Sequence, residues 1–435
     1  MEVKNLMELT NNRLSQTKIK YEISDVIIAV LALISIFCMF WYGIVGLISP
    51  SFSYKGFVAV VAVMTTLAFL KMIAERKTIP RITIWTLFIL IIIGFIYYVN
   101  LYRFNNGDAY DLSRSYFLCF IAQSSPSILM ATLLAYDERK CIFLKENIRH
   151  MSYVFAIISL IAILFQNNQV GGGGFTTDFG LNYQNVSYMA AYSSNYLVYD
   201  ITANGRNRKI IQNYFNYIVI AIDLIIILVS GGRGGFISFV VINGLQLFFV
   251  LKNRFSLKTM LKWIIMILAL GIASQLIISH MKGQIGIDRI FSFFKGQKDM
   301  SSKGRIELYK LALSSFKEKP VLGQGFGSVF FALGFHSHNI FFDVLVEGGI
   351  VGFSAIVIIL VGTIRRGLTM FRDDYTEMLW FIIFLNGSIM SFLSGYYLAN
   401  VPLLFGIFII MIKYKDRKVT CSEKNNFHIR NARSI

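Results

Sequence analysis

Three side chains that lie far apart in the sequence have types suited to chemistry on an anionic substrate: His338, Arg305 and Arg233. An imidazole near its ordinary pKa of about 6.5 can accept a proton at neutral pH, so His338 is a candidate general base. A guanidinium group can bind phosphate oxygens through two parallel hydrogen bonds, which suits both arginines to hold a phosphate. The three residues therefore predict a site where a hydroxyl group loses a proton beside cations that stabilise negative charge.

Each of these residues also has a plainer explanation. His338 could only hydrogen-bond backbone groups at a helix terminus, and His336 or His280 could serve as the base in its place. Arg305 could be an exposed cation at the membrane interface, and Arg233 could extend its guanidinium to lipid headgroups. Because a charge so close to hydrocarbon is costly, Arg233 still marks a candidate functional site.

The elements that position these residues are predicted to be membrane-spanning helices. The 435 residues are 55% hydrophobic and only 15% charged, and the mean hydropathy is +0.60. Backbone in lipid must satisfy its own hydrogen bonds, and no segment alternates with period two as a membrane β-strand would, so we expect an all-α, polytopic membrane helical bundle. By length and hydropathy, about twelve transmembrane helices are expected, at 26–48, 56–73, 82–101, 115–135, 150–166, 186–202, 213–230, 234–251, 260–280, 345–364, 377–395 and 399–413.

The distribution of Lys and Arg predicts the orientation of the chain. The N-terminal segment, the C-terminal tail and alternate loops are basic, and the positive-inside rule therefore places both termini in the cytoplasm. The basic loops are those at 71–81, 139–149, 206–209, 252–262 and 365–372. We expect four parts: a transmembrane bundle of nine spans at 1–280, a long structured outer loop at 281–337, a re-entrant helix with the last three spans at 338–413, and a cytoplasmic tail at 414–435.

The outer loop at 281–337 is basic although it is expected to lie outside the cytoplasm. Long loops are exempt from the orientation rule, so this charge is permitted. An anionic ligand would explain it, and a merely solvated basic surface is the alternative. Ile306, Tyr309, Leu313 and Phe316 recur at helical spacing and predict an amphipathic helix that Pro320 ends.

Several other patterns exclude classes of function. The net charge of +18 could suggest nucleic acid, but the basic residues form no single face, so no nucleic-acid partner is expected. The four cysteines have no spacing typical of a disulfide framework or a metal site. No cluster of His, Cys, Asp and Glu has metal-ligand spacing, so we expect neither a metal nor another cofactor. The three alternating glycines at 323–327 lack the βαβ context of a dinucleotide-binding loop.

The order of motifs in the second half of the chain resembles the O-antigen ligase and polymerase superfamily. Residues 338–352 (HNIFFDVLVEGGIVG) are similar to the signature HN-x-x-L-x-x-L-x-E-x-G-x-x-G, with Phe342 in place of the usual Leu. Upstream, residues 304–305 (GR) and 319–325 (KPVLGQG) resemble the stretch "GR … hPllGvG" of that family. Residues 230–234 (SGGRG) resemble its S-R-G motif, although two glycines separate the Ser from the Arg.

This resemblance implies a multi-span glycosyltransferase of the bacterial inner (plasma) membrane, with an active site that faces the periplasm. Its substrate would be an oligosaccharide carried on undecaprenyl diphosphate, and its further partners would be membrane lipids and a chain-length regulator protein. By the same resemblance, Arg233 and Arg305 would hold the diphosphate and stabilise it as it leaves, and His338 would deprotonate the acceptor hydroxyl. These three residues are the predicted catalytic residues.

Further residues are predicted to bind substrate beside the two arginines. They are His336, Asn339 and Glu347 around the signature, and Tyr183 and Asn185 from a segment at 182–188 that resembles polymerase-type members. The expected function is an O-antigen or related surface-polysaccharide polymerase. A ligase that transfers glycan to the lipid A core, and a lipid-linked sugar flippase or other transporter, are the alternatives. A transporter is expected to show paired repeats with broken helices, and we find no such repeat in the sequence.

Overall fold

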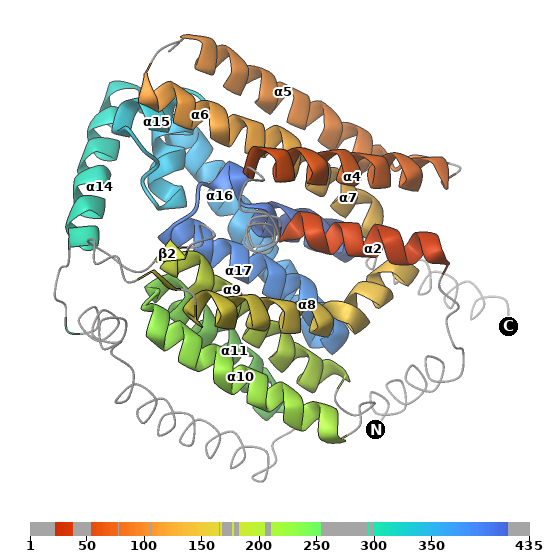
Figure 1. The fold of residues 1–435 in the computed structure, drawn as a ribbon. Helices are drawn as coiled ribbons and strands as arrows, with labels where there is room; N and C mark the ends of the chain where they lie inside the picture. Colours follow the sequence, from red (N-terminus) through yellow and green to blue (C-terminus); the bar gives the residue numbers. More distant parts are fainter. Residues whose placement is uncertain are drawn as a thin grey trace, which may run out of the picture.

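The computed structural model describes residues 22–37, 54–76, 78–103, 107–164, 166–167, 176–177, 182–204, 210–253, 295 and 300–415, which are almost entirely helical (Figure 1). The helices are α2 (Ile23–Ile36), α4 (Tyr54–Ala74), α5 (Arg81–Arg103), α6 (Asp108–Cys119), α7 (Ser125–Leu134), α8 (Glu138–Leu164), α9 (Tyr183–Tyr199), α10 (Ile210–Ser230), α11 (Arg233–Asn253), α14 (Met300–Glu318), α15 (Ser328–Leu333), α16 (Ile340–Asp373) and α17 (Met378–Leu393). Residues 401–415 form one more helix.

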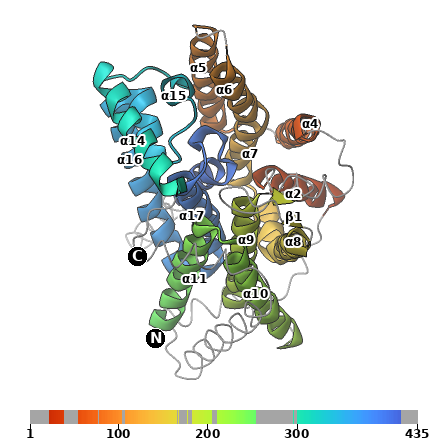
Figure 2. The same ribbon diagram turned by 60° about the vertical axis from the view of Figure 1, so that its left-hand side comes forward.

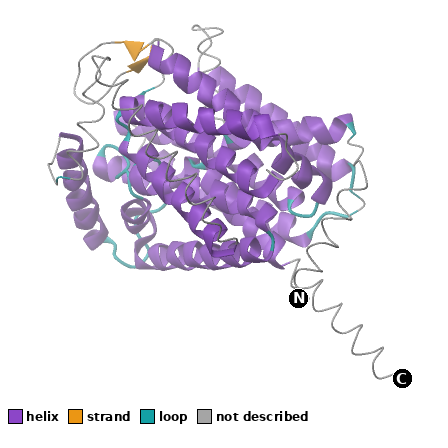
Figure 3. Cartoon of the chain, turned by 90° about the horizontal axis from the view of Figure 1, so that it is seen from below, coloured by secondary structure: helices purple, strands orange, loops and turns teal. Residues whose placement is uncertain are grey.

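Short irregular elements join some of these helices. They are the π-helical turns η1 (Phe120–Ser124) and η2 (Asp200–Asn204) and the 3-10 turns η4 (Tyr375–Glu377) and η5 (Tyr397–Ala399). Two strands of two residues each, β1 (Gln166–Asn167) and β2 (Thr176–Thr177), pair antiparallel, as Figure 3 shows in orange. The all-α prediction is therefore confirmed for the described residues, apart from this one short ladder.

Six described helices are long and apolar enough to cross a membrane. They are Arg81–Arg103, Asp108–Leu134, Glu138–Leu164, Ile211–Ser230, Ile340–Asp373 and Tyr375–Leu393. Three shorter helices, Ile23–Ile36, Val58–Ala74 and Arg233–Phe249, are also apolar. This composition supports a multi-pass membrane protein. The count of about twelve spans stays a prediction, and the span expected at 260–280 lies outside the described residues.

The lipid-facing and central helices differ in which side chains they expose. Helices α5 and α16 leave large apolar side chains uncovered, such as Trp85 and Phe95 on α5 and Ile358 on α16. In a bilayer these side chains would contact hydrocarbon, which is as apolar as they are. Helix α9, in contrast, is buried without interruption over residues 186–199 and packs against α8, α10, α11 and α17. Helix α9 is thus the centre of the bundle.

Asn195, one of the polar residues that make α9 weakly hydrophobic, is paired with a neighbouring helix. The Asn195 side chain donates from Nδ2 to Oδ1 of Asn386 on α17 at 2.7 Å. The Ser238 hydroxyl on α11 donates to the same oxygen at 2.9 Å. Because these partners replace water, polar residues are tolerated at this depth, and they join three helices at one level.

Helix α16 is interrupted at Gly349, where the backbone leaves helical geometry (φ 58°, ψ −155°). A loop at 320–325 replaces the helical hydrogen bonds that are lost there. Its bonds are Gln324 N–H to the Val346 carbonyl (2.8 Å), Gly325 N–H to the Glu347 carbonyl (2.8 Å), Ile350 N–H to the Pro320 carbonyl (2.9 Å) and Val351 N–H to the Val321 carbonyl (3.2 Å). The break in α16 and the glycine-rich loop are therefore one structural unit.

Glycine is required on both sides of this contact. A Cβ atom at Gly323 would lie 2.4 Å from the carbonyl carbon of Glu347, and one at Gly349 would lie 2.5 Å from the Val321 oxygen. Both glycines also have positive φ angles, which other residues rarely adopt. The two glycine motifs of residues 319–325 and 347–349 thus have a structural reason for occurring together.

The predicted amphipathic helix is present as α14, which lies along α16 (Figure 2). It ends at Glu318, two residues before Pro320, as expected. The predicted apolar stripe is shifted, however, because Leu313 is 44% exposed, whereas Ala312 and Ser315 are buried. The helix turns its smaller residues inward because it packs closely on α16, where the rings of Tyr309 and Phe342 stack with centroids 4.3 Å apart.

Candidate active site

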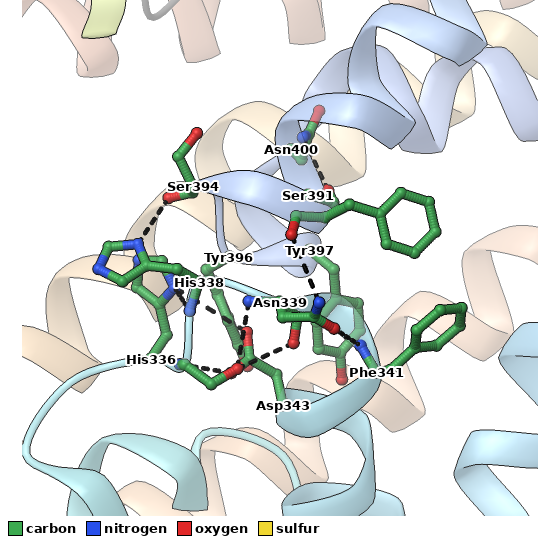
Figure 4. A network of polar contacts seen from close by, with 12 residues as sticks. His336, His338, Asn339, Phe341, Asp343, Ser391, Ser394, Tyr396, Tyr397 and Asn400 are labelled. Atoms are coloured by element: carbon green, nitrogen blue, oxygen red, sulfur yellow. Dashed lines mark hydrogen bonds and ion pairs between the residues drawn. The ribbon is translucent and has the colours of Figure 1, made fainter. Parts of the chain in front are cut away.

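The turn at residues 335–339 lies between α15 and α16 and carries both histidines of the signature (Figure 4). His338 has a φ of 61°, an unusual value for a residue with a side chain. The backbone N–H of Ser337 donates to Oδ1 of Asp343 at 2.7 Å, and Asn339 caps α16 by accepting from the N–H of Phe341 at 2.9 Å. These bonds hold the turn in a conformation of the kind that clusters at functional sites. The helix begins at Ile340, so the predicted His-Asn pair precedes it.

The His338 ring is oriented by Ser394, the residue that follows α17. Its Nδ1 atom lies 3.2 Å from the carbonyl oxygen of Ser394 (Figure 4). Because a carbonyl oxygen only accepts hydrogen bonds, Nδ1 must carry the proton, and the lone pair of a neutral ring is then on Nε2. The orientation therefore leaves Nε2 as the atom that can take a proton from a substrate.

The surroundings of His338 favour the neutral form that a base requires. Burial lowers the pKa of His338 below its ordinary value, and the positive charge of Arg305 lowers it further, while the Ser394 carbonyl acts in the opposite direction. The ring is only partly buried, so a substrate can still reach it. At neutral pH, His338 is thus unprotonated and accessible.

His336 differs from His338 in accessibility. Its side chain is 2% exposed, and its Nδ1 atom accepts a hydrogen bond from the backbone N–H of His338 at 3.2 Å. Burial, followed by the charges of His338 and Arg305, lowers the pKa of His336 well below its ordinary value. Aromatic rings of Tyr116 and Tyr396 surround it. A role for His336 in substrate binding stays a prediction, and its geometry favours support of the His338 turn.

Arg305 lies on the partly buried side of α14, within electrostatic range of both histidines. It shares this side with Tyr309, one turn later, which stacks on Phe342 at the start of α16. The charge of Arg305 thus acts on His338, although the two residues lie far apart in the chain. A guanidinium beside a neutral imidazole can stabilise an anion that forms next to the base.

Arg233 is the first residue of α11, directly after a turn in which Gly231 has a φ of 68°. The flanking glycines were candidates for a close approach by ligand, but α9 occupies the space beside them. A Cβ atom at Gly232 would lie 2.3 Å from the Ser187 side chain, and one at Gly234 would lie 2.0 Å from the Tyr188 hydroxyl. The glycines thus allow α9 to pack on the start of α11 beside Arg233.

A hydrogen bond then connects this region to the histidine. The Ser394 hydroxyl donates to the Tyr188 hydroxyl at 2.9 Å, and the carbonyl of the same serine contacts His338. The charge of Arg305 also acts on Tyr188. Tyr188 and Ser394 therefore link the start of α11, which carries Arg233, to the turn that carries His338.

Tyr183 and Asn185 lie in the first turn of α9, close to the start of α11. The backbone N–H of Asn185 donates to the side chain of Asn182, which caps the helix, at 2.9 Å. The carbonyl oxygen of Tyr183 lies 3.2 Å from the Cβ position of Gly232. Both residues are partly exposed near Arg233, and their predicted contact with substrate stays a prediction.

Glu347 is buried, and both oxygens of its carboxyl group accept hydrogen bonds from other residues of the protein. Its Oε1 atom accepts from the Gly327 N–H at 2.9 Å and from the Tyr396 hydroxyl at 2.8 Å, and its Oε2 atom accepts from the Tyr397 hydroxyl at 2.7 Å. The carboxylate thus ties the glycine-rich loop and η5 to α16. Substrate binding by Glu347 stays a prediction, and this geometry favours a structural role.

The sequence model of the family described as O-antigen ligase matches residues 218–357. This part of the chain is similar to the O-antigen ligase/polymerase superfamily. The resemblance predicted from the motifs is thereby confirmed. No curated protein and no solved structure matches the chain.

The superfamily match includes some parts of the site and not others. Arg233, Arg305 and His338 all lie within residues 218–357, whereas Tyr188 and Ser394 lie outside. Reasoning from sequence missed these two because neither residue type suggests chemistry alone. The repeated tyrosines at 396–397 were an available signal, since paired phenols in an apolar stretch need a buried partner. Among the described residues, no group of three or more His, Cys, Asp and Glu side chains could hold a metal ion.

Proposed function

We propose that this protein is a membrane glycosyltransferase that polymerises O-antigen or a related surface polysaccharide. It transfers a growing glycan from undecaprenyl diphosphate to a new lipid-linked repeat unit. The observation that carries this proposal is the His338 ring, whose Nδ1 contacts the Ser394 carbonyl while Arg305 acts on it from α14. A neutral, oriented base beside a fixed cation suits transfer of a sugar from a phosphate leaving group.

In the proposed reaction, the acceptor hydroxyl oxygen attacks the anomeric carbon of the donor sugar. A new glycosidic C–O bond forms as the bond from that carbon to the diphosphate oxygen breaks. The proton of the hydroxyl moves to Nε2 of His338, and the electron pair of the broken bond leaves with undecaprenyl diphosphate. The imidazolium later returns its proton to solvent, so no metal or redox partner is needed for balance.

The two arginines act on the leaving group in this mechanism. Negative charge grows on the bridging oxygen of the diphosphate as the bond breaks, and a fixed guanidinium lowers the energy of that state. The charge of Arg305 acts on the base, and Arg233 begins the helix that packs against Tyr188, which supports a role for both in this proposal. We expect Arg233 to bind the distal phosphate and Arg305 the phosphate next to the sugar.

A ligase that transfers the finished glycan to the lipid A core is the second candidate, because the matching family is described as O-antigen ligase. The two enzymes share the same donor and differ in acceptor. The proposed location is the bacterial inner membrane, with the site facing the periplasm and a chain-length regulator as partner. A flippase or other transporter is the third candidate, and it would form no new glycosidic bond.

Reconstitution separates these candidates. Purified protein in liposomes should convert lipid-linked repeat units to longer chains without any lipid A core. Elongation that requires the core would favour ligase, and movement of unchanged repeat units across the bilayer would favour a transporter. In a deletion strain, surface polysaccharide reduced to a single repeat on the core would support polymerase, whereas complete loss of attached repeats would support ligase.

A further inference from the structure

One contact near the candidate base has no part in the proposed reaction. Ser394 reaches two elements at once: its carbonyl oxygen lies 3.2 Å from Nδ1 of His338, and its hydroxyl donates to the Tyr188 hydroxyl at 2.9 Å. We infer that Tyr188 and Ser394 are positioning residues that fix the His338 ring relative to the start of α11. This inference rests on the proposed function, because it assigns the two residues to the same reaction.

The Ser394 carbonyl is held by the way in which α17 ends. The backbone N–H groups of Ser394 and Gly395 both donate to the carbonyl of Met390 at 2.8 Å. Ser394 itself leaves helical geometry, with φ −162° and ψ −17°. Its carbonyl therefore departs from the helical direction and is free to accept from the imidazole. The Ser394 carbonyl therefore has one orientation, and the contact of the Ser394 hydroxyl with Tyr188 stabilises it.

Tyr188 is held equally firmly on the other side. It is 1% exposed, and its hydroxyl occupies the space that a side chain at position 234 would need. The glycine after Arg233 is thus what admits the tyrosine to the start of α11. Through its hydroxyl, Tyr188 then fixes the Ser394 side chain. The contact chain runs from the Arg233 helix to the base without a gap.

The contacts of Ser394 and Tyr188 determine the tautomer and the orientation of the His338 ring. With Ser394 in place, the proton is on Nδ1 and the lone pair of Nε2 is available. Without the tyrosine contact, the end of α17 can shift and the ring can rotate or adopt the other tautomer. Since a displacement of about 1 Å at a reacting group can cost ~100-fold in rate, even a partial shift should be measurable. The loss should be in kcat and not in donor binding.

The same helix supplies a matched control. Tyr192, four residues after Tyr188, is also fully buried, and its hydroxyl donates to the Asn386 carbonyl on α17 at 2.9 Å. Tyr192→Phe therefore removes one buried tyrosine hydroxyl between the same two helices, two turns of α17 away from Ser394. A general loss of packing would affect both variants, whereas loss of positioning should affect only Tyr188→Phe.

The test measures kcat and KM for elongation in liposomes with purified, folded protein at matched amounts. Tyr188→Phe and Ser394→Ala should each lower kcat about tenfold with KM for the lipid-linked donor unchanged. The double variant should fall no further, because both changes break one interaction. Ser394→Thr, which keeps a hydroxyl, should regain most of the activity, and Tyr192→Phe should match the unchanged protein.

Other outcomes overturn the inference. Wild-type kcat in both single variants, losses that multiply in the double variant, a change confined to KM, or an equal loss in Tyr192→Phe would each show that the pair does not position the base. His338→Ala separates this failure from failure of the proposed function. An active His338→Ala enzyme overturns the proposed function, whereas an inactive one beside fully active Tyr188→Phe and Ser394→Ala overturns only the positioning role.

Discussion

The positively charged residues at the two ends of helix α17 differ in whether they form ion pairs. Helix α17 is flanked by Glu377 at one end and Ser394 at the other, about 26 Å away at the helical rise of 1.5 Å per residue. At the Glu377 end, Lys145 is 7% exposed and contacts the Glu377 carboxylate at 2.6 Å. At the Ser394 end, no ion pair of the described residues involves Arg305.

The Glu377 end contains a network of buried lysines and carboxylates from distant parts of the chain. The described pairs are Lys140 with Asp25 (3.0 Å), Asp137 (2.7 Å) and Glu75 (3.5 Å), Lys145 with Glu377 (2.6 Å) and Glu138 (3.9 Å), and Lys413 with Glu138 (2.8 Å). Each lysine is thereby neutralised within the protein. Such pairs fix helices in place, and breaking one leaves an uncompensated buried charge.

The Ser394 end instead combines a cation, a neutral imidazole and backbone turns that depend on glycine. The charge of Arg305 acts on that imidazole. The described basic residues at the two ends therefore differ in their partners. The lysines of the Glu377 end are paired with carboxylates, whereas Arg305 forms no ion pair with a described residue.

The largest effect is expected from removing the base. His338→Ala should lower elongation at least ~100-fold, because general-base catalysis contributes about 10²–10⁴ in rate. The measurement is chain elongation by purified protein in liposomes, with thermal unfolding recorded beside it. His150→Ala, which removes an exposed histidine of α8, is the control and should remain fully active. If His338→Ala still makes glycan chains of normal length, His338 is not the catalytic base.

The second largest effect is expected at the Glu377 end, where a substitution should lower the stability of the protein but not its activity. Lys145→Met leaves the Glu377 carboxylate buried without its lysine, which should cost about 3–5 kcal/mol of unfolding free energy. The midpoint of thermal unfolding in detergent measures this loss. Activity per folded molecule should not change, and the double variant Lys145→Met/Glu377→Leu should recover stability. Normal stability of the single variant would show that this network does not support the fold.

A smaller effect is expected from Glu347, whose buried carboxyl group is hydrogen-bonded within the protein. Glu347→Gln keeps the shape but turns an acceptor oxygen into an NH₂ group that faces a donor. The loss should be about 1–3 kcal/mol of unfolding free energy for one mismatched buried group. Elongation at low temperature, where the variant is folded, should be largely kept. A loss of activity without a loss of stability would instead favour direct contact between Glu347 and substrate.

The smallest and most specific effect is a shift in pH dependence. The charge of Arg305 lowers the pKa of His338, so Arg305→Gln should raise that pKa toward its ordinary value. The base acts only when unprotonated, so the acidic limb of kcat/KM should move to higher pH. Arg305→Lys keeps the charge and should keep the limb in place while lowering the rate, because ammonium lacks the bidentate geometry. If the acidic limb of the kcat/KM profile does not move in Arg305→Gln, the charge of Arg305 does not act on His338.

Much of the architecture could be predicted from sequence because hydropathy and helix signals are local. The apolar runs gave the helical spans, and Pro320 marked the end of α14. The inward face of α14 could not be read from periodicity, since Leu313 is exposed where α14 packs on α16. The basic residues at 139–149 were expected in a loop, but α8 begins at Glu138 and buries Lys140 and Lys145. Their partners include Asp25, Glu75 and Glu377, which lie far away in the sequence, and no local pattern reveals them.

For the candidate site, residue types and motif order were sufficient to select His338, Arg305 and Arg233 and the superfamily that residues 218–357 match. Only the tertiary structure decided which histidine is accessible, which nitrogen carries the proton, and that Glu347 bonds to the glycine-rich loop. These properties depend on Ser394, Tyr188 and other residues that reach the site from separate helices. The sequence determines which chemical groups are present. The packing of the helices determines which groups from different helices come close enough to form a hydrogen bond.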